Sequence, residues 1–257
     1  MLLLHASPGG AISDGVPGTQ HPNVGAMLVE WDPASRPGEL EPECSGSLLS
    51  PVHFLTSAYC LVALGQSGLG PHNVAVTFDE KALAPKTVVW AKDVVVHPNA
   101  LQRRDGADDV AVVTLATPVP DIKPVDLPAE GYLDEAAARG GLVDHSFVNV
   151  GYGVVPNDRQ RPAFQFDGVR RVSTSPYKGL TLAYLLLNMR TDATDEGGSC
   201  YGDSGSPKFF EPVPGARSNL VLAISSGGDR YCRAHNFNQR LDVPSVRSFL
   251  DDFVPVP

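Results

Sequence analysis

Short apolar runs bounded by turn residues recur along this chain of 257 residues. Their length, and the Gly, Pro and Asp residues that separate them, predict β-strands rather than long helices. Strand candidates lie at residues 26–31, 74–78, 88–96, 110–115, 147–154, 168–173, 180–187 and 220–225. Further short apolar runs lie around Pro51, between residues 45 and 63.

Apolar residues at helical spacing occur near the C-terminal end, over residues 243–253. Pro244 and Ser245 suit the first turn of a helix at that place. Residues 133–139 could add one or two helical turns. The pattern therefore predicts an all-β protein of barrel or sandwich type that ends in one helix.

Composition narrows the classes of partner. Gly and Pro together account for 48 residues, nearly a fifth of the chain, which also disfavours long helices. The net charge is −9 and the 20 basic residues are spread out, so no nucleic-acid partner is expected. No apolar run reaches the roughly 18 residues of a membrane-spanning helix, so no membrane partner is expected.

Two features bear on compartment and organisation. Residues 1–11 begin Met-Leu-Leu-Leu and resemble the end of a truncated signal sequence, with an artefact of the gene start as the alternative. Gly9 and Ala11 suit signal-peptidase cleavage before Ile12. A Pro-spaced connector at residues 118–128 predicts a boundary between two halves, about residues 12–125 and 126–257.

The cysteines favour export. No two of them are separated by the two to four residues typical of a zinc site, so disulfides are the better interpretation and a secreted protein is expected. Four cysteines can pair in three ways. They are Cys44, Cys60, Cys200 and Cys232.

The most informative segment is Cys-Tyr-Gly-Asp-Ser-Gly-Ser-Pro at residues 200–207. A serine between glycines, Ser204, can stand on a tight turn with its hydroxyl exposed and the neighbouring backbone N–H groups open to an oxyanion. The simpler alternative is an ordinary loop with a turn signal.

This segment resembles the nucleophile segment of the trypsin/chymotrypsin family of serine proteases. Other stretches resemble that family in the expected order over about residues 12–254. They are residues 11–15 (AISDG), 44–60 (CSGSLL through LTSAYC), 96–99 (VHPN), 109–113 (DVAVV), 150–153 (VGYG) and 224–227 (ISSG).

The resemblance implies a fold and a class of ligand. The fold is two six-stranded antiparallel Greek-key β-barrels with a C-terminal helix. The implied disulfides are Cys44–Cys60 and Cys200–Cys232. A polypeptide substrate or partner, no cofactor, no metal and a monomeric chain are expected.

The resemblance also implies site residues. Ser204 is the nucleophile, Asp109 the orienting aspartate with Asp108 beside it, and Ser225 a support for that aspartate. The N–H groups of Gly202 and Ser204 form the oxyanion hole. The substrate-binding residues are Gly198, Ser225, Ser226, Gly227 and Asn236. Gly198 implies a neutral, roomy pocket floor that suits an apolar or aromatic side chain. Ser206 stands where the family usually has Gly.

One departure decides the expected activity. The family motif reads Ala-His-Cys, whereas this chain has Tyr59 between Ala58 and Cys60. Imidazole, with a pKa of about 6.5, can take the serine proton and return it near neutral pH, but a phenol has a pKa of about 10. A buried Asp109 nearby would raise the pKa of that phenol further. We therefore expect peptide hydrolysis to be strongly impaired.

No other histidine is expected to serve as the base. His235, shortly after Cys232, is the nearest candidate, and a packing or solvated histidine is the better interpretation of each. A second open point is activation. In the family, a freed N-terminus at the position of Ile12 would pair with Asp203, so either residues 1–11 are removed or Asp203 has another partner.

Three hypotheses for function follow. The chain is a pseudoprotease that binds peptides or proteins, an active serine endopeptidase in which Tyr59 is an introduced change, or a slow hydrolase of activated esters that uses Ser204 and the oxyanion hole.

Overall fold

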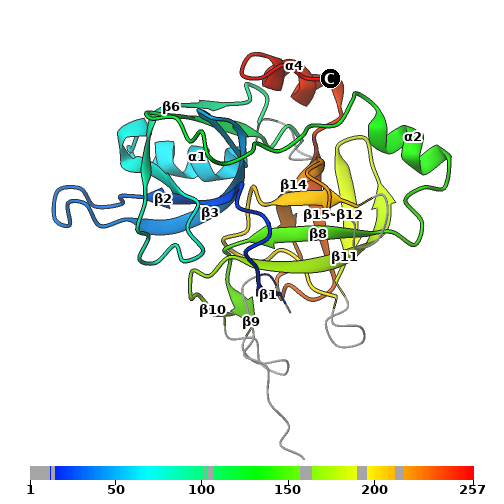
Figure 1. Cartoon of the computed structure of the whole chain (residues 1–257), viewed down its shortest axis with the longest axis horizontal. Coiled ribbons are helices and arrows are strands. Elements are labelled where there is room, and N and C mark those ends of the chain that lie inside the picture. The colour runs from blue at the N-terminus through cyan, green and yellow to red at the C-terminus, as the bar shows by residue number, and fades with distance from the viewer. Residues whose placement is uncertain are drawn as a thin grey trace, which may run out of the picture.

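Two antiparallel β-barrels lie next to each other in the computed structural model (Figure 1). The structure describes residues 12, 15–100, 102, 107–156, 164–189, 196–211 and 217–257. The segment predicted as a leader, residues 1–11, lies outside the described residues.

The first barrel closes through six strands. Its core includes Met27, Leu48, Phe54 and Val113, and helix α1 (Ala58–Gln66) adds Leu61 to it. Round the ring, the order is β2 (Val24–Val29), β3 (Glu41–Ser50), β4 (His53–Thr56), β7 (Ala111–Leu115), β6 (Val89–Val96) and β5 (Val74–Thr77), with a short 3₁₀ turn η1 (Pro71–Asn73) before β5.

The second barrel also closes through six strands, because β8 pairs with both β13 and β11. The ring runs β8 (Ser146–Gly151), β11 (Arg171–Leu180), β12 (Tyr184–Asn188), β15 (His235–Arg240), β14 (Val221–Gly228) and β13 (Pro207–Phe210). Outside it lie β1 (Val16–Pro17), which pairs with β11, the hairpin of β9 (Val155–Pro156) and β10 (Phe164–Gln165), and helices α2 (Tyr132–Ala138) and α4 (Pro244–Asp251).

Apolar packing and buried polar contacts fix the barrels against each other. One core cluster takes Leu55 and Val112 from the first barrel and Phe209 and Ile224 from the second. Arg170 reaches across and donates to the backbone oxygens of Val24 at 3.1 Å and Phe78 at 3.0 Å. Buried polar groups that find partners in this way hold one geometry, so side chains from both barrels can share a site.

The predicted all-β fold of two six-stranded barrels with a C-terminal helix is confirmed. Both implied disulfides are present, Cys44–Cys60 and Cys200–Cys232. Among the residues that the structure describes, no helix is long and apolar enough to cross a membrane.

Candidate active site

The buried carboxylate of Asp203 anchors the loop that carries Ser204. Asp203 is fully buried, and its two oxygens accept hydrogen bonds from the N–H groups of Gly153 at 2.9 Å and Cys200 at 3.0 Å. Gly205, which follows the serine, has φ +81°, and a Cβ there would lie 2.5 Å from the oxygen of Ser45. The loop therefore requires glycine at residue 205, where it packs closely against the first barrel.

The predicted oxyanion hole has free donors. Gly202 has φ +87°, a left-handed conformation that favours glycine. Within the described residues, the N–H groups of Gly202 and Ser204 donate to no protein acceptor. Free N–H groups of this kind are what an oxyanion requires.

Asp109 lies at the boundary between the barrels and is only 4% exposed. Burial raises the pKa of its carboxyl group, and hydrogen bonds from Ser226 and Ser57 oppose that rise. The Ser57 hydroxyl lies 2.7 and 2.8 Å from the two carboxylate oxygens, and the Ser226 hydroxyl donates to one of them. The N–H of Tyr59 adds a bond at 2.9 Å and that of Ala58 a further one. The carboxylate is therefore fully occupied by donors other than a catalytic base.

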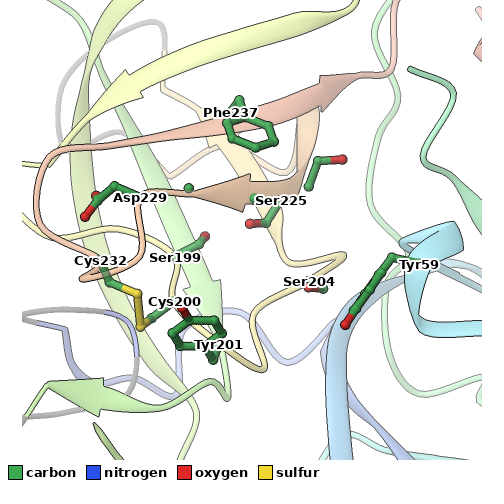
Figure 2. Close-up of a pocket in the computed structure, with 12 residues that line it drawn as sticks. Tyr59, Ser199, Cys200, Tyr201, Ser204, Ser225, Asp229, Cys232 and Phe237 are labelled. Carbon is green, nitrogen blue, oxygen red and sulfur yellow. A yellow bond between two sulfur atoms is a disulfide. The ribbon is translucent and has the colours of Figure 1, made fainter. Parts of the chain in front are cut away.

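Tyr59 is the second residue of α1, and Ser57 is the N-cap of that helix. The Ser57 oxygen accepts a hydrogen bond from the N–H of Tyr59 at 3.2 Å. The Tyr59 side chain, by contrast, is 54% exposed and lines a pocket together with Ser204 (Figure 2). Its hydroxyl makes no hydrogen bond with any residue that the structure describes. The chain of contacts from aspartate to base to serine is thus interrupted at Tyr59.

The serine that supports Asp109 is Ser226, and the prediction of Ser225 for this role is wrong. The pairing of β14 with β15 is irregular between Ser225 and Gly227, and this bulge changes which side chain faces the aspartate. Both serines line the pocket, and the backbone of Ser225 bonds to the Ser204 loop through Gly205 and Ser206.

The pocket beside Ser204 has a volume of about 270 Å³. Its walls and floor combine exposed aromatic rings, small polar side chains and the Cys200–Cys232 disulfide (Figure 2). The lining residues are Tyr59, Ser199, Cys200, Tyr201, Ser204, Ser225, Ser226, Gly227, Gly228, Asp229, Cys232 and Phe237.

The prediction of a roomy floor above Gly198 is not met. A Cβ on Gly198 would lie 2.6 Å from Met189 Cγ and 2.7 Å from Asn236 Nδ2, so these side chains fill the space. Asn236, predicted for the wall, is completely buried and does not line the pocket. Gly227 lines the pocket, and a Cβ there would lie 2.6 Å from the ring of Phe237, which also lines it. Ser199 and the Cys200–Cys232 disulfide line the pocket instead.

None of the six described histidines lines this pocket. His235 begins β15, and its N–H donates to Asp229. Within the described ranges there is no group of three or more His, Cys, Asp or Glu side chains placed to hold a metal ion.

Comparison with known proteins agrees with this geometry, since the Trypsin family model matches residues 31–246. This chain belongs to the trypsin family. Glucanase inhibitor protein 3 of Phytophthora infestans is 29% identical over 189 residues, which cover 72% of this chain and 68% of that protein. Glucanase inhibitor protein 1 of Phytophthora sojae is 29% identical over 196 residues, with the same two shares. Brachyurin of Leptuca pugilator is 30% identical over 196 residues, 72% of this chain and 75% of brachyurin.

Sequence reasoning missed two residues of this trypsin-family site. The first is Ser57, which the sequence could have indicated as a helix N-cap before Ala58. Its contact with Asp109 could not be predicted, because the two residues are 52 positions apart in the chain. Lys208 follows the nucleophile segment in an otherwise apolar strand, Pro-Lys-Phe-Phe, and it is completely buried. A charged residue in the interior of such a strand is an unusual signal, because buried lysine needs partners.

Proposed function

We propose that this trypsin-family chain is a pseudoprotease, which binds polypeptide in the cleft beside Ser204 and hydrolyses it far more slowly than an active relative would. The observation that carries the proposal is the set of hydrogen-bond donors that contact the Asp109 carboxylate. Ser57 and Ser226 occupy its carboxylate, and the Tyr59 side chain lies outside that contact.

The chemistry supports impaired hydrolysis. Acyl transfer to Ser204 needs a group that removes the hydroxyl proton and later protonates the leaving amine. A phenol with a pKa of about 10 is a donor at neutral pH, and a serine hydroxyl such as that of Ser57 is no better as a base. Loss of the histidine in subtilisin, an unrelated serine protease, lowers turnover by roughly 10⁶-fold. A comparable loss is proposed here.

The proposed partner is a polypeptide presented by another protein. The pocket exposes Tyr59 and Tyr201, each about half exposed, beside small polar residues. Exposed aromatic side chains are the anchors that protein interfaces favour. Several relatives are named glucanase inhibitor proteins, so a chain of this fold that acts by binding another enzyme has a precedent.

Secretion is part of the proposal. The two disulfides are of the kind that persists in oxidising compartments. The proposed form of the protein is a monomer.

Activity on peptides and casein tests the proposal. The purified chain should bind unlabelled peptides and leave them intact, whereas hydrolysis at the ordinary rates of trypsin-like enzymes would refute the pseudoprotease hypothesis. The remaining alternative is an active serine endopeptidase in which Tyr59 is an introduced change. Reading the codon for residue 59 in the source gene tests it, since a histidine codon would support this alternative and a tyrosine codon would remove it.

The free N–H groups of Gly202 and Ser204 favour one secondary activity, slow hydrolysis of activated esters. Such esters have good leaving groups that need no protonation, so Ser204 and an oxyanion hole could act on them without a strong base.

A further inference from the structure

A buried lysine lies directly behind Ser199, which lines the pocket. Lys208 on β13 is completely buried, and its ammonium group donates to the hydroxyl of Ser199 and, at 3.1 Å, to that of Ser206. The two hydroxyl oxygens are 3.3 Å apart. Ser199, 5% exposed, lines the pocket, whereas Ser206 and Lys208 do not.

No carboxylate neutralises this cation by direct contact. Among the described residues no Asp or Glu oxygen lies within 4 Å of Lys208 Nζ, and both oxygens of the neighbouring Asp203 are held by backbone N–H groups. Burial lowers the pKa of Lys208, while the charge of Asp203 raises it. The ammonium group of Lys208 therefore interacts electrostatically with Asp203 and donates a hydrogen bond to Ser199 of the pocket lining.

Counting protons shows that the floor has a spare donor. Lys208 donates to both serine oxygens, so neither hydroxyl gives its own proton to the lysine. The contact between Ser199 and Ser206 uses only one of their two hydroxyl protons. Either hydroxyl can be the donor in that contact. When the buried Ser206 donates to Ser199, the proton left over is that of Ser199, which borders the pocket. A ligand that accepts a hydrogen bond from Ser199 would thus meet a donor polarised by the ammonium behind it.

Asp229 is the one acidic residue that lines the pocket, and its carboxylate contacts the backbone of the loop that follows it. Asp229 accepts hydrogen bonds from the N–H groups of Tyr231, Arg233, Ala234 and His235. These four bonds lower the pKa of Asp229 against the effect of its burial. Three of these bonds go to Oδ2 and one to Oδ1, so four backbone dipoles stabilise the charge of Asp229 and hold its carboxylate toward its own loop.

We propose that the pocket takes the carboxylate side chain of an Asp or Glu residue of the partner, which Ser199 binds by hydrogen bond and Lys208 stabilises from behind. This inference rests on the proposed binding function, and it replaces the apolar preference expected from Gly198. Figure 2 shows Ser199 beside the disulfide, across the pocket from Tyr59, so the carboxylate would enter past Tyr59 and Ser204.

The test compares acetylated tetrapeptide amides that differ only in the last residue, which is Glu, Gln, Leu, Phe or Lys. NMR titration of the full chain would give each dissociation constant from the amide shifts of residues 199–202 and Gly227. We expect the Glu peptide to bind at least about tenfold more tightly than the Gln and Leu peptides. Tighter binding of the Leu or Phe peptide would overturn the inference.

Two variants tie the preference to the named residues. In Ser199→Ala the charge of Lys208 stays and the donor is lost, and in Lys208→Met the charge itself is lost. Each should bring the Glu and Gln peptides within about twofold of each other, while Lys92→Met on the exposed face of β6 should leave the preference intact. A Glu preference that persists in Ser199→Ala would overturn the assignment even if Lys208→Met failed to fold.

The outcomes separate this inference from the function on which it rests. Binding with an apolar preference overturns only the carboxylate assignment. Rapid hydrolysis of the peptides overturns the pseudoprotease proposal but leaves the order of dissociation constants to decide the assignment. Absence of binding by all five peptides overturns both.

Discussion

The Ser57 hydroxyl lies 2.7 Å from a carboxylate oxygen of Asp109, although 52 residues separate the two in the chain. Ser57 also caps the helix that carries Tyr59. One hydroxyl therefore links the start of α1 to the aspartate, and it occupies an acceptor that a catalytic base would need. The predictions below follow from this arrangement and from the loops and buried groups around it.

Restoring a base should restore activity in two steps. Tyr59→His should raise kcat/KM on peptide substrates, and adding Ser57→Ala should raise it further because Asp109 then has a free acceptor for the imidazole. A positioned general base contributes about 10²–10⁴-fold, so we expect the double variant to recover at least this part of the roughly 10⁶-fold loss proposed above. Progress curves with chromogenic peptide amides measure it. Ser57→Ala alone serves as the control and should gain nothing, and an inactive double variant would point to a defective oxyanion hole.

Activated esters should acylate Ser204. With a nitrophenyl ester, we expect a burst of nitrophenol of about one equivalent, followed by slow turnover, because the acyl-enzyme lacks a base for its hydrolysis. Stopped-flow absorbance measures the burst. Ser204→Ala should abolish it, and Ser67→Ala at the end of α1 should not. Equal rates in Ser204→Ala and the natural sequence would exclude this reaction.

Gly205 should be far less tolerant of a side chain than an exposed glycine with the same conformation. A Cβ on Gly205 would lie 2.5 Å from the oxygen of Ser45 and 2.6 Å from the nitrogen of Ser57, whereas Gly68, with φ +75°, has nothing within 4 Å. Gly205→Ala should cost about 3 kcal/mol in the free energy of unfolding, and Gly68→Ala about 1 kcal/mol. Urea denaturation compares them, and similar losses would contradict the packing argument.

His21 should make the fold sensitive to mild acid. Burial, then the charges of Arg170 and Arg217, lower the pKa of His21 to about 4, below its ordinary value of 6.5. Between pH 6.5 and 4 the unfolded chain therefore binds the proton more readily, so this contribution is complete above pH 6.5 and is lost as the pH falls toward 4. The loss is at most about 3 kcal/mol.

Denaturant unfolding at several pH values measures the contribution of His21. In His21→Gln the free energy of unfolding should fall less steeply between pH 6.5 and 4 than in the natural sequence. His72→Gln, at the exposed position of the η1 turn, is the matched control and should keep the full slope. Identical slopes in the natural sequence and in His21→Gln would contradict the assignment.

Regular apolar runs made much of the fold predictable. The candidates at residues 74–78, 88–96 and 110–115 correspond to β5, β6 and β7, and the helical spacing at residues 243–253 to α4. Helix α1 was missed because its residues continue an apolar stretch without a clear period, although Ser57 offered a cap signal. Strand β15 was missed because Asn236, Asn238 and Gln239 point into the protein and find partners there, which no apolar pattern reveals.

Two parts of the candidate site were out of reach for the sequence. The bulge in β14 decided that Ser226, not Ser225, bonds to Asp109. The space above Gly198 was filled by Met189 and Asn236, which come from other strands or their ends. The bond to Asp109 and the packing above Gly198 both depend on contacts between segments that are far apart in the chain. Local residue spacing does not predict such contacts.

The sequence by itself determined the all-β class, the glycine-flanked turn at Ser204 and the tyrosine at residue 59, since each depends on residues adjacent in the chain. Only the tertiary structure decided that Ser57 occupies Asp109 and that Lys208 stands behind Ser199. Barrel closure and the packing of the two barrels bring these groups within hydrogen-bond distance. Buried polar groups take whatever partners that packing supplies, because the cost of leaving them unpaired is large.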